Sequence, residues 1–311
     1  MAAAVYTDYK KMLREAPIDA VDICSTHATH AELAVAAAEA GKHVLVEKPM
    51  ACSMTECRAM VAAAERSGVK LMVAQFERYI PAHRALKKCI ADGELGTVRG
   101  LQFDYMQNFP DAVRREHWLF DGKEAGGGAV ISIAVHRIDL MRYLVGDIRR
   151  VSGSCRTINP RFFNGAEDYA VATLEFENGR GGAIGAMFTT YSGARMPWAT
   201  QYMIFGDEGA VHAVPQLGEY SGKPMIASRR RDGGVKEWGD MFKGFVPVEA
   251  EKSEMETEDP FINQVLHFEK CCRTGEEPWS GGKDNLNTMA TVFGIYASSA
   301  NGGRPVELAE M

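Results

Sequence analysis

The chain has 311 residues, of which 46% are hydrophobic and 24% charged, and its formal net charge is −6. These proportions are typical of a globular protein and exclude collagen-like, coiled-coil and wholly disordered chains, while a length beyond ~250 residues favours two domains. Because we find no ~18-residue apolar run, no signal peptide and no basic stripe, we expect a cytoplasmic protein with a small-molecule partner, and neither a membrane nor nucleic acid as partner.

The first hundred residues alternate short apolar runs with helical patterns. Strands are predicted at 20–24, 43–46 and 70–74, and helices at 10–14, 30–40 and 55–66. Gly41 is expected to end the second of these helices. Short runs of this kind, joined by helices, are typical of parallel strands with right-handed crossovers. The pattern predicts an α/β fold that begins with a Rossmann-type doubly wound parallel sheet in residues 1–97.

Beyond residue 97 the strands are longer and alternate in character. Strands are predicted at 98–105, 168–177 and 181–189, helices at 128–144, 261–272 and 285–300, and a polar surface excursion at 228–259. Alternation of apolar and polar residues indicates a sheet with one covered face. We therefore expect a second α/β domain in residues 98–311, with an open, mainly antiparallel sheet.

The seven cysteines contain no CxxC pair and include a vicinal pair that cannot easily bridge. They are residues 24, 52, 57, 89, 155, 271 and 272. We interpret them as reduced thiols buried as small hydrophobes, and expect no metal site.

The glycine motif of dinucleotide-binding sheets, GxGxxG, follows no strand of this sequence. The three glycines Gly126-Gly127-Gly128 come after a polar loop, which is the wrong context. The strand at 20–24 would then be a bare edge strand beside a missing neighbour. We expect an N-terminally truncated, incomplete Rossmann domain that lacks its first two βα units, and weak or absent binding of NAD or NADP.

One candidate for chemistry is Glu47-Lys48-Pro49, directly after the strand at 43–46. Ligands of α/β sheets bind beyond the carboxyl ends of strands, and Pro49 keeps Lys48 out of a helix. A desolvated lysine there can hold a substrate hydroxyl and relay protons. The alternative is a solvated lysine in an ordinary loop.

A second candidate is the loop after the strand at 20–24, which contains Ser25, Thr26, His27, Thr29 and His30. Its backbone amides and hydroxyls suit a ribose or a nicotinamide amide, and Thr29 is expected to cap the next helix. The alternative is a helix cap with two surface histidines.

The third candidate lies on the helix at 128–144. Ser132, His136 and Asp139 have the spacing of one helix face within an otherwise apolar stretch. Buried polar groups must be satisfied or face a cleft. A lone histidine is more often a core residue, whereas alignment with two other polar groups favours a functional role.

Together these motifs resemble the Gfo/Idh/MocA family of NAD(P)-dependent enzymes that act on sugars, cyclitols and related compounds. The resemblance extends from Tyr6-Thr7-Asp8-Tyr9 through Glu47-Lys48-Pro49, Gly93-Glu94-Leu95-Gly96 and the helix with His136 to the tail at 302–306. It implies a Rossmann domain followed by an α/β domain whose open sheet often forms the oligomer interface. A homo-oligomer through this sheet is expected.

The resemblance implies roles for particular residues. Lys48 would polarise the substrate oxygen, and His136 would take the hydroxyl proton as hydride leaves for the nicotinamide. Ser132 stands where family members commonly carry an aspartate four residues before this histidine. A hydroxyl cannot stabilise an imidazolium as a carboxylate does, which leaves the substrate class open.

Further contacts are implied by the segment at 75–79 and by Trp118. Gln75 is expected to contact the cofactor, as are Ser25, Thr26, His27, His30, Glu47 and Lys48. Glu77 is interpreted as a group that recognises a substrate hydroxyl, or equally as a solvated salt-bridge partner. Trp118 would lie on the nicotinamide side of the cleft or anchor a domain interface.

Three functions remain open on the sequence. The first is an NAD(P)-dependent oxidoreductase of a sugar, cyclitol or related polyol, with Lys48 and His136 at its centre. The second is a truncated, cofactor-free binding or oligomerisation module. The third is a lyase or epimerase of the same family with transient redox chemistry.

Overall fold

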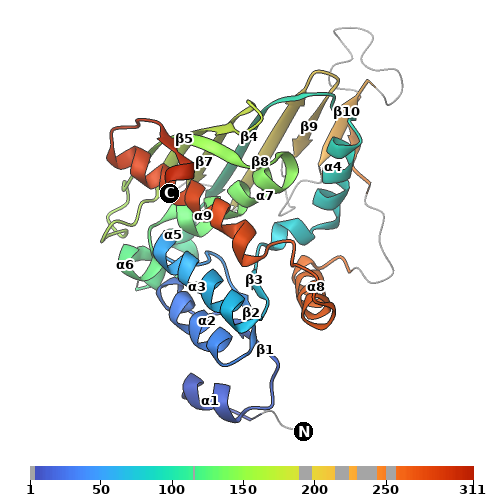
Figure 1. The fold of residues 1–311 in the computed structure, drawn as a ribbon. Helices are drawn as coiled ribbons and strands as arrows, with labels where there is room; N and C mark the ends of the chain where they lie inside the picture. Colours follow the sequence, from blue (N-terminus) through green and yellow to red (C-terminus); the bar gives the residue numbers. More distant parts are fainter. Residues whose placement is uncertain (1–3, 115, 189–197, 214–223, 230–243, 250–256) are drawn as a thin grey trace.

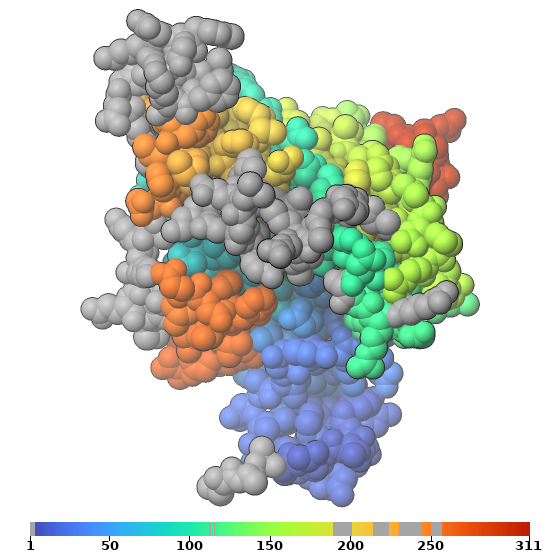
Figure 2. All heavy atoms as spheres, turned by 180° about the vertical axis from the view of Figure 1, so that it is seen from behind, coloured from blue at the N-terminus to red at the C-terminus, as the bar shows by residue number. Residues whose placement is uncertain are grey.

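The computed structural model describes residues 4–114, 116–188, 198–213, 224–229, 244–249 and 257–311 (Figure 1). They form a three-stranded sheet in the order β1-β2-β3 and a nine-stranded sheet in the order β11-β10-β9-β8-β4-β7-β6-β5-β12. In the space-filling view, the N-terminal residues form a lobe below the larger lobe of the second sheet (Figure 2). The predicted α/β class, with a parallel sheet followed by a mainly antiparallel one, is confirmed.

The small sheet is parallel throughout, with β2 between its neighbours. Its strands are β1 (Ala20–Ile23), β2 (His43–Val46) and β3 (Leu71–Val73), and its helices are α1 (Tyr9–Glu15), α2 (His30–Glu39) and α3 (Met54–Ser67). Val44 and Val46 are fully buried. Gly41 and Gly68 follow α2 and α3 with φ of 73° and 66°, a left-handed conformation that ends a helix at little cost. The predicted strand and helix order is confirmed.

Strand β1 forms one edge of the small sheet as described, which agrees with the predicted edge position. Asp22 is exposed and Val21 half-buried, whereas Ile23 is buried. An edge strand presents backbone N–H and C=O groups without ladder partners on one side.

The short helix η2 (Phe76–Tyr79) and helix α4 (Pro81–Ala91) lead from the small sheet to the large one. Its strands are β4 (Val98–Gln107), β5 (Ile148–Arg156), β6 (Tyr169–Phe176), β7 (Gly181–Met187), β8 (Trp198–Gly206), β9 (Gly209–Ala213), β10 (Met225–Ser228), β11 (Val246–Pro247) and β12 (Val306–Glu307). Neighbouring strands are antiparallel except for β4 and β7, which are parallel. Helices α7 (Val135–Val145) and α9 (Gly282–Ala300) cover one face of this sheet (Figure 1).

The helix predicted at 128–144 differs from expectation at its start. It begins with a π-helical turn, Val130–Ala134, and becomes α-helical only in α7. The backbone N–H of Val130 bonds the Glu167 carboxylate and that of Ile131 bonds the Tyr296 hydroxyl. At the start of this helix, side-chain oxygens therefore accept the hydrogen bonds that backbone carbonyls accept further along a regular helix.

Two further predictions need correction. Thr29 does not cap α2 through its side chain, because its hydroxyl donates to Ser25 Oγ and the Thr26 carbonyl instead. The excursion predicted at 228–259 is not entirely on the surface, because Ser228 at the end of β10 and Val248 after β11 are buried, and β11 pairs with β10 as the edge strand of the sheet. The rest of that stretch lies largely outside the described residues.

A buried ion pair fixes α7 against its neighbours. The Arg78 guanidinium donates to both carboxylate oxygens of Asp139, at 2.6 and 2.7 Å, and Asp139 also accepts from the Thr288 hydroxyl on α9. Asp139 is fully buried. Asp139 does not line the cavity that Ser132 and His136 share, because its carboxylate is paired with Arg78, so the predicted three-residue face is wrong for Asp139.

Among the described residues, no helix is long and apolar enough to cross a membrane, and no group of three or more His, Cys, Asp or Glu side chains could hold a metal ion. All seven cysteines are free thiols. Cys57, Cys89 and Cys271 are buried as predicted, but Cys24 is exposed because it lies just past the end of edge strand β1.

Candidate functional site

A cavity of about 460 Å³ lies beyond the carboxyl ends of β1 and β2. Its walls come from the loops after these strands, from η2, from the ends of β4 and β7, from η3 (Trp118–Phe120), from the π turn with α7 and from the start of α8 (Pro260–Thr274). The lining residues are Cys24, Ser25, His27, Glu47, Lys48, Phe76, Tyr105, Gln107, Phe109, Trp118, Leu119, Ser132, Ile133, His136, Phe188 and Phe261.

Lys48 lines this cavity and reaches across it. Its ammonium donates a hydrogen bond of 3.0 Å to the backbone carbonyl of Ser132. Burial lowers the pKa of Lys48, and the neighbouring carboxylate of Glu47 partly opposes that shift. The alternative of a solvated loop lysine is wrong, since the side chain is enclosed by the two walls of the cavity.

His136 lies on the opposite wall with 5% of its surface exposed. Its Nδ1 has no hydrogen-bond partner among the described residues, and the Phe76 ring packs edge-on against it at 5.0 Å between centroids. Burial, followed by the charges of Lys48 and Arg137, holds the pKa of His136 well below its usual value. The imidazole is therefore neutral near pH 7 and able to accept a proton.

Ser132 takes part mainly through its backbone. Its carbonyl oxygen holds Lys48, while its buried hydroxyl has no partner among the described residues. Ser132 and His136 both line the cavity.

The loop after β1 places some of the predicted cofactor contacts on the wall and others away from it. Ser25 and His27 line the cavity, whereas Thr26 and His30 do not. The predicted alternative of two surface histidines is wrong. His27 bonds the Ala125 carbonyl through Nδ1 at 2.9 Å, and His30 is fully buried between the carbonyls of Pro49 and Ser25. Burial lowers the pKa of both imidazoles, that of His27 to about 3.

Trp118 lines the cavity beside this loop. Its ring meets that of His27 edge-on, with 4.6 Å between the centroids. Glu47 also lines the cavity, and burial raises the pKa of its carboxyl group.

Gln75 and Glu77 are buried but do not line the cavity. Glu77 therefore has no place on the cavity wall from which to contact a substrate hydroxyl, and the alternative of a solvated salt-bridge partner is wrong because the side chain is buried. Its carboxylate forms a buried ion pair with Arg137, at 3.1 Å. The tight 3₁₀ turn of η2 presents Phe76 to the cavity and turns the residues on either side of it inward.

Sequence reasoning missed most of the apolar wall. Phe76, Tyr105, Phe109, Phe188 and Phe261 come from five separate elements of the chain. Only the tertiary fold brings these segments together, and no local pattern carries that information. Aromatic rings of this kind can pack against the apolar face of a sugar ring.

The described residues fit one half of a dinucleotide. Ser25, Glu47 and Trp118 offer polar groups and an aromatic face suited to a nicotinamide and its ribose. The loop from β1 to α2 contains no glycine, so these residues include no cradle for the pyrophosphate at that helix.

The fold and the cavity define a two-part α/β protein with a Rossmann-type ligand crevice, and comparison with known proteins gives its family. A family profile described as "Oxidoreductase family, NAD-binding Rossmann fold" matches residues 1–75, and one described as "GFO/IDH/MocA C-terminal domain" matches residues 83–212.

Relatives of known activity extend over almost the whole chain. A D-apiose dehydrogenase of Paraburkholderia graminis is 30% identical over 98% of this chain and 76% of its own length. The scyllo-inositol 2-dehydrogenase (NAD(+)) of Bacillus subtilis is 28% identical over 97% and 81%. A structure of levoglucosan dehydrogenase in complex with NADH and levoglucosan has a TM-score of 0.82 at 26% identity, covering 97% of this chain and 83% of that one.

The chain belongs to the Gfo/Idh/MocA family of NAD-binding sugar and polyol oxidoreductases. The predicted family and enzyme class are confirmed. The expectation that this chain binds its cofactor weakly or not at all gains no support from the comparisons.

Proposed function

We propose that this protein transfers hydride between a hydroxyl-bearing carbon of a sugar, cyclitol or related polyol and a nicotinamide cofactor, NAD or NADP. The proposal is supported by the positions of Lys48 and His136. They line the same cavity from opposite walls, although they come from elements far apart in the chain. The Ser132 carbonyl holds the Lys48 ammonium, and Nδ1 of His136 has no hydrogen-bond partner among the described residues.

The cofactor, when bound, supplies the hydride acceptor. This chain's residues handle the substrate oxygen and its proton. The neutral imidazole of His136 accepts the hydroxyl proton while the C–H bond breaks with its electron pair, leaving a carbonyl. The Lys48 ammonium donates a hydrogen bond to the same oxygen and stabilises its developing negative charge.

We propose residues 1–97 as the cofactor-binding part and residues 98–311 as the substrate-binding and oligomer-forming part. Within the first, Ser25, His27, Glu47 and Lys48 would contact the nicotinamide and its ribose, together with Trp118 from the second. Thr26, His30 and Gln75 act at most through packing, since their side chains do not line the cavity. A cytoplasmic location remains a prediction.

The experiment is to mix the purified protein with NAD or NADP and a panel of polyols and to follow reduced nicotinamide by absorbance. We expect turnover with at least one polyol and its loss in Lys48→Ala and His136→Ala. Lys42→Ala and His212→Ala are matched controls, because neither residue lines the cavity. Near-full turnover in either cavity variant would remove that residue from the mechanism.

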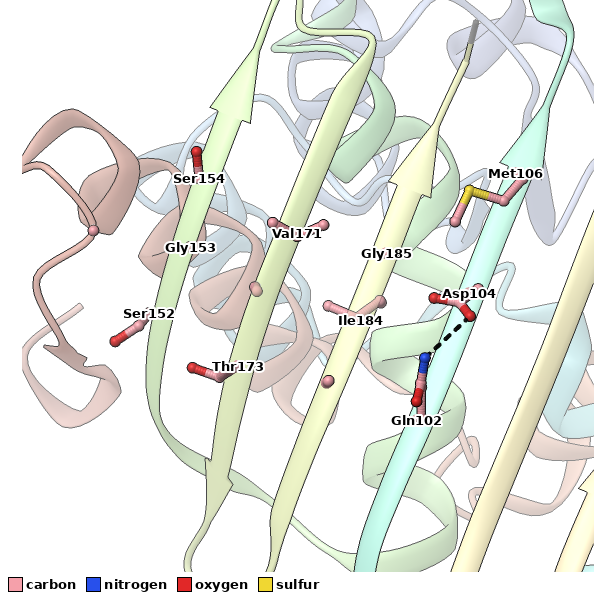
Figure 3. Close-up of a pocket in the computed structure, with 13 residues that line it drawn as sticks. Gln102, Asp104, Met106, Ser152, Gly153, Ser154, Val171, Thr173, Ile184 and Gly185 are labelled. Atoms are coloured by element: carbon pink, nitrogen blue, oxygen red, sulfur yellow. Dashed lines mark hydrogen bonds between the residues drawn. The ribbon is translucent and has the colours of Figure 1, made fainter. Parts of the chain in front are cut away.

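The open face of the large sheet is proposed as the surface of a homo-oligomer. A hollow of about 480 Å³ lies on it, lined by β4, β5, β6 and β7 (Figure 3). Val171 is 40% exposed there, so this face presents an apolar side chain to solvent. Sedimentation analysis of Val171→Glu should show smaller particles than the wild type. Ile158→Glu, at an exposed position outside the hollow, is the control.

A further inference from the structure

The glycine-led segment before the π turn is held by a carboxylate that the mechanism does not use. Glu167 lies just before β6, with 4% of its surface exposed. Its Oε2 accepts a 2.7 Å hydrogen bond from the backbone N–H of Gly128, and its Oε1 accepts one of the same length from Val130. Both carboxylate oxygens therefore act as acceptors at the first turn of the helix that carries His136.

Tyr296 of α9 completes this arrangement. Its hydroxyl donates to Glu167 Oε1 at 3.0 Å and accepts from the backbone N–H groups of Gly128 and Ile131, at 3.3 and 3.2 Å. One carboxylate and one hydroxyl thus take the backbone N–H groups of residues 128, 130 and 131, which have no intrahelical partner at a helix start.

Gly127 and Gly128 permit this close approach. A Cβ at Gly127 would lie 2.3 Å from Tyr296 Oη, and one at Gly128 would lie 1.8 Å from the backbone oxygen of Glu167. Both distances are too short for non-bonded atoms. Two glycines of the run that has no place in a dinucleotide motif are therefore explained by their contacts with the Tyr296 side chain and the Glu167 backbone.

We propose that Glu167 and Tyr296 are positioning residues that orient the π turn so that Ser132 and His136 face the cavity. The amides they hold precede Ser132 directly, and the Ser132 carbonyl in turn holds Lys48. A shift of this turn moves the lysine anchor and the imidazole together, although neither Glu167 nor Tyr296 lines the cavity. Small displacements of reacting groups reduce rates strongly.

Two substitutions test the hydrogen bonds that Glu167 and Tyr296 form with the π turn. Glu167→Gln keeps size and shape, but its NH₂ group must face a backbone N–H donor, either that of Gly128 or that of Val130. Tyr296→Phe keeps the ring and removes only the hydroxyl, leaving the Ile131 N–H unpaired. Both changes disturb the turn without touching the cavity wall.

Asp168→Asn is the matched control. Asp168 is also buried and also accepts two backbone N–H groups, those of Ile158 and Asn159, so its amide variant meets the same conflict between donors. That loop is separate from the π turn. A general loss of stability would therefore affect all three variants, whereas displacement of His136 would affect only two.

The first measurement is NMR of the full chain labelled at its eight histidines, with the His136 signal assigned by its absence in His136→Asn. We expect the His136 ring signals to shift in Glu167→Gln and Tyr296→Phe and to stay in place in Asp168→Asn. Unchanged signals in both variants, with folding retained, would overturn the proposal. If Glu167→Gln does not fold, Tyr296→Phe alone decides.

The second measurement rests on the proposed function. With an active polyol, we expect kcat to fall ~10- to 100-fold in Glu167→Gln with the KM for cofactor unchanged. If Glu167→Gln were only less folded, Asp168→Asn should lower the apparent kcat by the same factor. An equal fall of kcat in both variants would therefore contradict a positioning role. Absence of turnover in the wild type would refute the proposed function, while the NMR result would still test the positioning role.

Discussion

The ammonium nitrogen of Lys48 lies 3.0 Å from the backbone carbonyl oxygen of Ser132, so the end of β2 is joined directly to the π turn on the opposite side of the cavity. Lys48 lies in the loop that follows β2 of the small sheet, and Ser132 lies in the π turn that leads into α7 on the large sheet. A substrate hydroxyl that binds between them can share the ammonium, which has three hydrogen-bond donors.

The pH dependence of oxidation should follow His136. Burial and the charges of Lys48 and Arg137 lower its pKa, so the neutral, proton-accepting form persists below pH 6.5. We expect kcat/KM to decline only at pH values well under 6.5, and His136→Asn to lose about 10²- to 10⁴-fold in rate together with this acid limb. A wild-type decline centred above pH 6.5 would show that another group is the base.

Substitution of Ser132 by aspartate should change the pH dependence of kcat/KM. Its side chain lines the cavity together with Lys48 and His136, and a carboxylate there would favour the charged forms of both. We expect Ser132→Asp to raise the pKa of His136 and move the acid limb upward by ~1 pH unit or more. Ser132→Asn, of similar size and neutral, should leave the limb in place.

The buried pair of Glu77 and Arg137 should matter for stability and not for substrate affinity. Removing the carboxylate in Glu77→Leu leaves the Arg137 charge buried and unpaired, at a cost of about 3 to 5 kcal/mol in unfolding free energy. Glu77→Leu combined with Arg137→Met should recover most of that loss. A large rise in KM for substrate, with stability unchanged, would restore the hydroxyl-binding role predicted for Glu77.

Glu167 should give the unfolding curve a pH dependence. Burial raises its pKa to about 7, against the hydrogen bonds from Val130, Tyr296 and Gly128. Since the folded-state pKa lies above the ordinary value of 4.5, this group's contribution is complete below pH 4.5 and is lost as the pH rises through about 7. The titratable groups that interact with Glu167 are Tyr296 and Cys155. Their pKa values are raised, so neither group titrates between about pH 4.5 and 7.

We therefore expect the melting temperature of the wild type to decline between about pH 5 and pH 8 more steeply than that of Glu167→Gln, in which this titration is absent. Thermal unfolding monitored by circular dichroism at several pH values measures the difference. Equal slopes in Glu167→Gln and wild type would refute the assignment.

Much of the fold could be predicted because local signals agreed with the tertiary structure. The short strands 20–24, 43–46 and 70–74 and their helices form nearly as expected, since buried parallel strands and left-handed glycines have strong local signatures. Lys48 could be placed at the crevice because Glu47-Lys48-Pro49 directly follows a strand.

The site was harder to predict, because its details depend on distant contacts. Glu77 was interpreted as a surface or substrate group, and its pairing with Arg137 across sixty residues leaves no local mark. The π turn likewise depends on Glu167 and Tyr296, which are remote from it in the sequence. A polar residue beside the right motif can thus be turned away from the cavity by a partner that only the folded chain reveals.

Helix α9 packs against both α3 of the small sheet's layer and β5 of the large sheet. This one helix of 19 residues therefore packs against both parts of the protein and connects them. Hinge-like opening of the cavity would have to break one of these two packed contacts. A relative movement of the two sheets that keeps both contacts would therefore have to be a sliding along α9, as in shear motions of packed helices.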